Sequence, residues 1–202
     1  MWAIIPINSF KKTMTRLSEV LNANQRIKLT KLLTQQIIDH LLGIPEIEKI
    51  VLLTNETKWA QSFDDKKIIL KANQDRLSLK ENINQTADWL WEQGAKKMLY
   101  LSIDLPLALK DDVLDLINQH RNGLTLVIAN KDGGTNALIL DMPRSFPFQF
   151  GENSLEKHLA EAKKFGVETQ ALNIHGLSFD LDDIDDWNHL IATNKSLLNK
   201  LD

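Results

Sequence analysis

The sequence predicts a single α/β domain over residues 1–202, built on a mostly parallel, mixed sheet. Short aliphatic runs, typical of strands buried on both faces, alternate with segments whose apolar residues recur at helical spacing. With 202 residues and 43% hydrophobic composition, the chain is long enough for one large core and short for two ordinary domains.

Composition and charge exclude several functional classes. A formal net charge of −3 with interspersed signs argues against a nucleic-acid or anionic-membrane surface. The chain has no cysteine, which excludes disulfides and thiolate chemistry, and its five histidines lack the spacing of metal ligands. Because no apolar run approaches a membrane span and the N-terminus lacks a secretory pattern, we expect a cytoplasmic protein.

The N-terminal segment predicts a strand followed by a polar loop. Residues 2–6 form an aliphatic run that should end at its proline, which cannot continue the ladder. The loop 8–18 contains Lys11, Lys12 and Arg16, cations that suit a nucleoside triphosphate at the end of a first strand. The alternative is that these cations are only solvated.

The next elements are predicted from helical periodicity and capping residues. Asn22 or Asn24 caps a helix whose apolar residues continue to Leu42, and Gly43 with Pro45 ends it. Shorter segments complete this half of the chain, namely strands at 47–54 and 67–70 with a loop or short helix at 55–65.

A capping box opens a second long helix. Ser78 and Glu81 form this pair, and the helix should continue to about Gln93 before Gly94 stops it. Its last turn carries large apolar side chains that we interpret as packing residues and not as a base-stacking platform: Trp89, Leu90 and Trp91.

An aspartate follows the next predicted strand, at residues 98–102. Ligands in open α/β sheets bind beyond the carboxyl ends of strands, so Asp104 is placed for a metal ion or a substrate hydroxyl. The alternative is that Asp104 only caps a turn. A short helix over residues 110–120 follows.

A glycine loop joins two aliphatic runs at residues 125–129 and 137–140, and its sequence is Asp132-Gly133-Gly134-Thr135-Asn136. The glycines permit positive φ and bring bare backbone close to a ligand. The threonine and asparagine offer a hydroxyl and an amide, with backbone N–H groups free to bind an oxyanion. The alternative is an ordinary glycine turn between strands.

A second anion site is predicted where a helix begins near residue 155. Gly151 can bring backbone close to a ligand, and Asn153 or Ser154 caps a helix start whose partial positive charge favours anions. Most capped helices bind nothing, which is the alternative. The helix should reach Phe165, and a late strand over residues 169–174 follows.

Alternate aspartates near the C-terminus predict a metal site. Asp180 and Asp182 lie on one side of an extended segment by the two-residue strand period, and such carboxylates suit Mg²⁺. The alternative is an acidic start for the helix that carries Trp187, and for Asp183 and Asp186 we prefer this alternative.

These features together predict nucleotidyl transfer. A substrate oxygen would attack the α-phosphorus of a nucleoside triphosphate, and pyrophosphate would leave. Asp104, Asp180 and Asp182 would hold the metal ions that neutralise the charge. We assign no general base, because a phosphate or carboxylate oxygen of the acceptor is already ionised at neutral pH.

Motifs over nearly the whole chain resemble those of a known family: Ile5-Pro6 with Arg16-Leu17-Ser18, Asp104-Leu105-Pro106-Leu107, Asp132-Gly133-Gly134-Thr135-Asn136-Ala137-Leu138, Phe150-Gly151 with Ser154 and His158-Leu159, and Asp180-Leu181-Asp182. The family is the guanylyltransferases that make the phospho-hydroxyacid precursor of the deazaflavin coenzyme of methanogens and actinobacteria. The resemblance implies a three-layer, glycosyltransferase-A-like nucleotidyltransferase fold. It also implies GTP as donor and 2-phospho-L-lactate, phosphoenolpyruvate or 3-phosphoglycerate as acceptor.

The resemblance also implies roles for individual residues. It places Mg²⁺ on Asp104, Asp180 and Asp182, and gives Asp104 and Arg16 catalytic roles. The acceptor acid would be bound by Thr135, Gly151 and Ser154, with Gly133, Gly134 and Asn136 beside them. The nucleotide would contact Arg16, Lys11 and Lys12.

The sequence departs from the family pattern at the nucleotide end. Two lysines expected near the triphosphate are Asn8 and Met14 here, and Lys11 or Lys12 would have to compensate. The stretch Leu79-Lys80-Glu81-Asn82 replaces a pattern like Leu-Asn-x-Ala.

Three hypotheses therefore stand. They are the guanylyltransferase, a related nucleotidyltransferase with another base or acceptor, and a binding protein that keeps the acid and metal sites without turnover. The metal assignment predicts that Asp104→Asn reduces turnover far more than Asp183→Asn. The sequence does not specify the oligomeric state, and a homodimer is compatible with it.

Overall fold

A seven-stranded sheet runs through the structure: β1 (Trp2–Ile7), β2 (Lys49–Thr54), β3 (Ile68–Lys71), β4 (Lys97–Leu101), β5 (Leu124–Ile128), β6 (Thr135–Asp141) and β7 (Thr169–Leu172). The strand order is β3-β2-β1-β4-β6-β5-β7. Strand β6 is antiparallel to β4 and β5, whereas the other recorded pairs are parallel. The predicted mostly parallel, mixed sheet is confirmed.

The computed structural model describes residues 1–194 and 196–201. Its helices are α1 (Ala23–Leu42), α2 (Thr57–Ala60), α3 (Leu79–Glu92), α4 (Lys110–Gln119), α5 (Ser154–Lys164), α6 (His175–Ser178), α7 (Ile184–Thr193) and α8 (Ser196–Asn199), with 3-10 turns η1 (Phe10–Lys12) and η2 (Thr15–Leu17). Within those residues, no helix is both long and apolar enough to cross a membrane.

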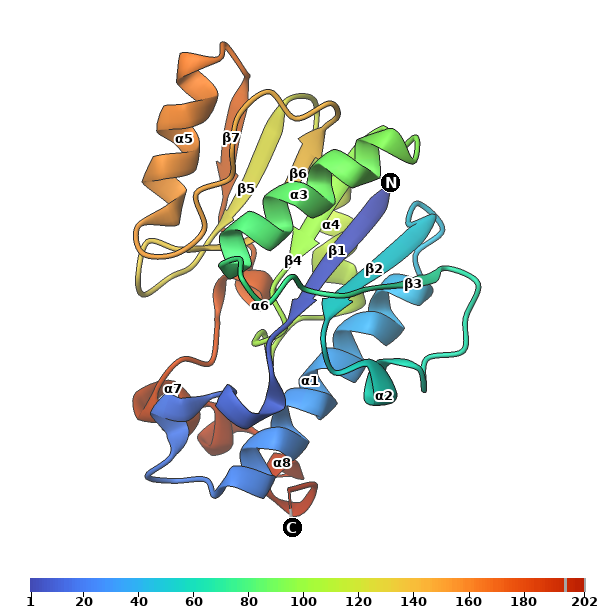
Figure 1. Ribbon diagram of the computed structural model, residues 1–202. Coiled ribbons are helices and arrows are strands. Elements are labelled where there is room, and N and C mark those ends of the chain that lie inside the picture. Colours follow the sequence, from blue (N-terminus) through green and yellow to red (C-terminus); the bar gives the residue numbers. More distant parts are fainter. Residues whose placement is uncertain (195, 202) are drawn as a thin grey trace.

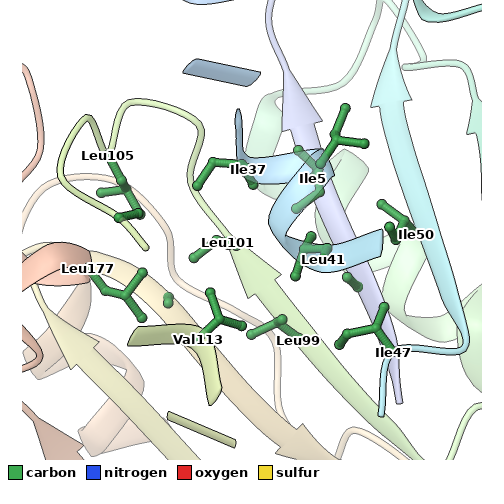
Figure 2. Packing of buried hydrophobic residues seen from close by; sticks show 14 of the residues in the cluster. Ile5, Ile37, Leu41, Ile47, Ile50, Leu99, Leu101, Leu105, Val113 and Leu177 are labelled. Carbon is green, nitrogen blue, oxygen red and sulfur yellow. The ribbon is translucent and has the colours of Figure 1, made fainter. Parts of the chain in front are cut away.

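Alternating side chains of the strands fill a separate core on each face of the sheet. On one face, Ile5, Leu52 and Leu99 belong to a cluster with residues of α1 and α4. Figure 2 shows part of it, with Leu41 of α1 and Val113 of α4 among the labelled side chains. On the other face, Ile4 and Leu138 belong to a cluster with α3 and α5. The result is a three-layer arrangement, with α3 crossing one face and α4 lying behind the other (Figure 1).

A third apolar cluster lies beyond the carboxyl ends of the parallel strands. It joins Leu17 and Leu29 to Leu181, Trp187 and Leu201. Figure 1 shows α7, α8, the segment after β1 and the start of α1 gathered there, at the opposite end of the molecule from the N-terminus. The cluster therefore fixes the basic loop and the aspartate segment at one end of the sheet.

Predicted capping residues set the starts of the two long helices, α1 and α3. Asn22 forms a capping box with Gln25 at the start of α1, and Ser78 forms one with Glu81 at the start of α3. The Asn22 side chain satisfies a backbone N–H that would otherwise have no partner within the helix.

Pro6 does not end the first strand, contrary to the prediction. Strand β1 continues to Ile7 and pairs with β2 over its whole length, but its pairing with β4 is recorded only for Trp2–Ile4. One side of the strand is therefore free of ladder pairing at Pro6, so the missing N–H can be tolerated.

The aromatic cluster at the end of α3 is only partly a packing element. Leu90 is fully buried, and Trp89 packs edge-on against Trp2 with ring centroids 6.3 Å apart. Trp91 is 40% exposed and carries Lys96 over its ring, so the packing interpretation does not place this residue in the core. The three-residue run cannot all face the sheet, because neighbours on a helix point about 100° apart.

Candidate active site

The site lies where the strand order reverses. Strands β2 and β3 lie on one side of β1 and β4 lies on the other, so the crevice between the carboxyl ends of β1 and β4 is a topological switch point. Ligands of open α/β sheets bind at such points. The loop 8–18 follows β1 and Asp104 follows β4, so the structure brings both to this crevice.

Three adjoining pockets open at this edge of the sheet. A central pocket of about 200 Å³ is lined by Asn8, Lys12, Arg16 and Asp104, among others. A hairpin pocket of about 590 Å³ shares Arg16, Asp104 and Asp182 with it and extends to Thr135, Gly151 and Ser154. An amide pocket of about 200 Å³ shares Asn8 with the central pocket and is lined by Asn55, Asn73, Asp75 and Asn82.

Four carboxylates converge between the central and hairpin pockets. The backbone N–H of Leu181 donates to the carbonyl of Asp104 at 2.9 Å, which sets the segment containing Asp180 and Asp182 beside the end of β4. Asp180, Asp182 and Asp132 each offer a carboxylate oxygen, and these oxygens lie within 4.8 Å of one another. The predicted pair is thus brought together, although its segment lies outside the sheet.

The negative charges in this cluster are held at an electrostatic cost. Burial, followed by the charges of Asp104 and Asp182, raises the pKa of Asp180 to about 6, although the Asn136 side chain opposes the rise. Burial also raises the pKa of Asp104, and the neighbouring Asp182 and Asp132 carboxylates add to this increase. A cation would relieve both the burial cost and the repulsion.

The donor set fits a hard divalent cation. The carboxylates that can share an ion in the described chain come from Asp132, Asp180 and Asp182, with Asp104 next to them. All the donors are oxygens, which suit Mg²⁺, and none is a histidine or thiolate, which zinc would favour.

The glycine loop holds the Asp132 carboxylate in place. The backbone N–H of Gly134 donates to Asp132 Oδ1 at 2.7 Å, and a Cβ atom on Gly134 would lie only 2.6 Å from that oxygen. Gly133 has φ +66, which side-chain-bearing residues rarely adopt. The two glycines therefore serve different purposes. Gly134 lets the Asp132 carboxylate approach the backbone closely, and Gly133 lets the backbone adopt a positive φ.

Gly134→Ala is expected to lower the affinity for Mg²⁺ about tenfold or more, because the new methyl group displaces the Asp132 carboxylate. Gly133→Ala is the matched control. Its Cβ would meet only Asn153 Oδ1, at 3.6 Å, so it should cost about 1 kcal/mol of stability through its positive φ and keep the Mg²⁺ affinity. Titration calorimetry and thermal unfolding measure the two effects. Equal Mg²⁺ affinities for the two variants would contradict this role of Gly134.

Lys131 ties the glycine loop to the start of α7. Its Nζ lies 2.5 Å from Asp183 Oδ2 and 3.1 Å from Asp186 Oδ1. Asp183 Oδ1 also accepts the backbone N–H groups of Asp185 and Asp186, which caps the helix. The preferred interpretation of Asp183 and Asp186 as a helix start is confirmed, and both now also anchor the loop that carries Asp132.

The hairpin pocket contains a hydroxyl network instead of a helix cap. Thr135 and Asn136 begin β6 and do not lie in the loop, contrary to the prediction. Neither Asn153 nor Ser154 caps α5 with its side chain: Asn153 is left-handed with φ 52, and Ser154 Oγ donates to Thr135 Oγ1 at 3.1 Å. Gly151, with φ +115, lines the same pocket.

The basic loop brings some of its predicted cations to the site. Arg16 is exposed, lines both the central and hairpin pockets, and pairs with Asp182 at 3.0 Å. Lys12 lines the central pocket with Asn8 and Met14, the two positions where lysine was expected. Lys11 is exposed and is absent from the residues that line this pocket.

Sequence reasoning missed two parts of the site. The motif that contains Asp132 gives this residue no role, although a carboxylate at the start of a Gly-Gly loop, at the end of a strand, is a signal for a ligand. The amide pocket was missed because its residues come from the ends of β1, β2 and β3 and the start of α3, and no local spacing links them.

Residues 1–197 match the sequence model of the family described as "Guanylyl transferase CofC like". A 2-phospho-L-lactate guanylyltransferase of Methanobrevibacter ruminantium is 30% identical over 174 residues, which cover 81% of this chain and 73% of the relative. A phosphoenolpyruvate guanylyltransferase of Rubrobacter xylanophilus is 28% identical over 196 residues, which cover 95% and 94% of the two chains.

Solved structures share the fold at low sequence identity. A candidate nucleotide-diphospho-sugar transferase from Desulfovibrio desulfuricans G20 superposes with a TM-score of 0.80 at 16% identity, covering 98% of this chain and 94% of that one. A 4-diphosphocytidyl-2C-methyl-D-erythritol synthase from Anaerococcus prevotii has a TM-score of 0.59 at 14% identity, covering 96% and 95%. The nucleotidyltransferase-like fold is confirmed.

Proposed function

The chain belongs to the family of CofC-like guanylyl transferases, and on this premise we propose that it transfers GMP from GTP to a three-carbon phospho-acid and releases pyrophosphate, in deazaflavin coenzyme biosynthesis. The acceptor is 2-phospho-L-lactate, phosphoenolpyruvate or 3-phosphoglycerate. The observation that carries the proposal is the position of the carboxylate cluster, which includes Asp104 and Asp182. On one side of it lies the central pocket, which contains cations, and on the other lies the hairpin pocket, which contains hydroxyl donors.

We infer a place for each part of the substrates from the residues that line the pockets. The triphosphate lies in the central pocket, near Lys12 and Arg16. The phospho-acid lies in the hairpin pocket, where Thr135, Gly151 and Ser154 offer hydroxyl and backbone groups. The nucleobase lies in the amide pocket, which adjoins the central pocket at Asn8.

The reaction needs positioning and charge stabilisation more than proton transfer. The attacking oxygen of the acid is already ionised, so the protein has to hold it in line with the α-phosphorus and exclude competing water. Mg²⁺, held by Asp180 and Asp182 with Asp104 or Asp132, would neutralise charge on the phosphates. Arg16 reaches the edge shared by both pockets and so stabilises charge where the two substrates meet.

The test is pyrophosphate release from the purified protein with Mg²⁺, using each of four nucleoside triphosphates crossed with the three acids. Turnover with GTP and one acid is the expected result, and it means that Lys12 and Arg16 suffice without lysines at positions 8 and 14. Turnover with another nucleotide would replace GTP in the proposal. Binding of an acid with no turnover would favour the binding-protein hypothesis.

The amide pocket predicts how guanine is distinguished from adenine. Asn55 Nδ2 donates to Asp75 Oδ1 at 2.6 Å, which fixes this carboxylate, and Asn73 Oδ1 is buried with no partner in the described chain. Both groups accept hydrogen bonds, and the N1 and N2 groups of guanine donate them, whereas N1 of adenine accepts.

Asp75→Asn is therefore expected to lower kcat/KM for GTP by about ten- to a hundredfold, because a bond to a charged acceptor is lost. Activity with ATP should not fall. Competition between GTP and ATP in the pyrophosphate assay measures the ratio, and exposed Asp64 provides the control Asp64→Asn. A GTP preference that survives Asp75→Asn unchanged would place the base elsewhere.

A further inference from the structure

A buried histidine lies directly behind the hairpin pocket. His158, on α5, is 0% exposed, and its ring packs edge-on against both Phe148 and Phe150, with centroids 5.9 and 5.0 Å away. Its Nε2 lies 2.9 Å from the backbone N of Gln149, and its Nδ1 lies 3.2 Å from Thr135 Oγ1. Both ring nitrogens of His158 therefore take part in hydrogen bonds.

The two contacts determine which ring nitrogen carries the proton. A backbone N–H can only donate, so Nε2 must be the unprotonated acceptor of the Gln149 N–H. Burial lowers the pKa of His158 to about 4, so the ring is neutral near pH 7. A neutral imidazole has one N–H, which is then on Nδ1 and donates to Thr135 Oγ1.

The same logic sets the direction of the Thr135 hydroxyl. Its oxygen accepts one hydrogen bond from His158 and a second from Ser154 Oγ, at 3.1 Å, which uses both acceptor positions. Its own proton has no acceptor in the described part of the chain. Thr135 lines the hairpin pocket, so that proton is available to a ligand there.

We propose that His158 is a positioning residue that fixes the Thr135 hydroxyl as a hydrogen-bond donor to an anionic oxygen of the phospho-acid. This inference rests on the proposed function for the identity of the ligand. A fixed donor avoids the entropy of choosing between orientations when the ligand binds, and it disfavours ligands that present a donor at the same point.

Two substitutions at position 158 separate the contacts. In His158→Gln the side-chain amide oxygen can take the place of Nε2 and keep the Gln149 contact, whereas the donor to Thr135 is lost. In His158→Asn the amide nitrogen can take the place of Nδ1 and keep donating to Thr135. We expect KM for phosphoenolpyruvate or 2-phospho-L-lactate to rise about tenfold in His158→Gln, and KM for GTP to stay unchanged. His158→Asn should recover most of the loss.

A second buried histidine provides the matched control. His120 Nδ1 lies 2.9 Å from Thr125 Oγ1 and its Nε2 lies 3.3 Å from Asp141 Oδ1. Asp141 ends β6, whereas Thr135 begins it, so this pair lies at the other end of the strand. His120→Gln should lower the melting temperature and leave KM for the acid unchanged. It therefore shows the effect of losing a buried histidine that contributes only to stability.

A double-mutant cycle with Thr135→Val tests whether His158 acts through Thr135. The double variant should be no worse than Thr135→Val alone. Additive losses, or an unchanged KM for the acid in His158→Gln, would overturn the inference. The ¹⁵N chemical shifts of His158 in the unaltered protein test it without any variant, because a proton on Nε2 would also overturn it.

The outcomes also separate this inference from the proposed function. Calorimetry with phosphoenolpyruvate and Mg²⁺ measures acid binding without turnover. If the unaltered protein binds the acid but turns over no nucleotide, the proposed reaction is wrong, and the dissociation constants of the variants decide the role of His158. If it binds none of phosphoenolpyruvate, 2-phospho-L-lactate and 3-phosphoglycerate, both ideas are wrong.

Discussion

Asp182→Asn is expected to lower kcat by roughly a thousandfold while the protein stays folded. The side chain belongs to the group whose oxygens lie within 4.8 Å of one another, and the substitution removes a charged ligand from the proposed Mg²⁺ site. Metal charge at a phosphoryl group supplies several kcal/mol of transition-state stabilisation, and each 1.36 kcal/mol is about a factor of ten in rate. Asp180→Asn should have an effect of the same order.

The stability of these variants distinguishes a lost ligand from a damaged fold. Burial raises the pKa values of Asp180 and Asp182 above that of an unfolded aspartate, so their ionised forms are disfavoured in the folded protein. A neutral asparagine removes that cost, and the melting temperature without Mg²⁺ at pH 7 should not fall. A large drop in melting temperature would mean that the activity loss reflects unfolding.

Asp104→Asn and Asp132→Asn decide which carboxylate completes the site. The sequence predicts Asp104, which also accepts a hydrogen bond from Ser102 Oγ at 2.5 Å, whereas the group that can share an ion contains Asp132. Asp183→Asn is a poor control for Asp104→Asn, because Asp183 caps α7 and binds Lys131. Asp185→Asn, at an exposed position in the same turn, is the better control, and a loss there equal to that of Asp104→Asn would contradict the metal assignment.

Mg²⁺ affinity should also depend on pH in a defined direction. With a pKa of about 6, Asp180 binds a proton as the pH falls from 7 to 5, and a protonated carboxyl group is a poor ligand. The affinity should therefore weaken over that range and level off above it. Calorimetry across the range measures this, with proton release on Mg²⁺ binding near pH 6 as the second readout.

The strands, the main helices and the positions of Asp104, Asp180 and Asp182 could be predicted because each depends on local pattern. A buried strand shows as an aliphatic run, and a capping box such as Ser78 with Glu81 lies within four residues. His158 could not be assigned this way, because its role depends on Thr135, 23 residues away, and on the backbone of Gln149. Such contacts depend on how α5 packs on the sheet, so they cannot be predicted from the spacing of residues in the sequence.

The case of Pro6 shows why tertiary context overrides a sound local rule. Proline ends a central strand when both of its sides must pair, but the sheet opens on the β4 side of β1 before Pro6. That opening is the crevice in which the central pocket forms. The failed prediction and the site therefore have the same cause, the divergence of β1 and β4.

Arg16→Ala is expected to reduce kcat by about a hundred- to a thousandfold, the second largest effect. Arg16 lines both the central and hairpin pockets, so its charge lies where the α-phosphate and the acid meet in the proposed reaction. Removing one preorganised donor from a developing charge typically costs a factor of about a hundred or more. Arg16→Lys keeps the positive charge but loses the planar guanidinium group, so its kcat should lie between that of Arg16→Ala and that of the unaltered protein.

The stability of Arg16→Ala distinguishes a lost interaction with the substrates from a damaged fold. The Arg16 side chain is 71% exposed, and its ion pair with Asp182 is a surface contact, which contributes little to folding. The melting temperature should therefore stay close to that of the unaltered protein, as it should for Arg121→Ala, a control at an exposed arginine in the segment between α4 and β5. A loss confined to KM for GTP would show that Arg16 only binds the nucleotide. A loss in kcat would show that the guanidinium group interacts more strongly with the transition state than with the bound substrates, as its position between the pockets requires.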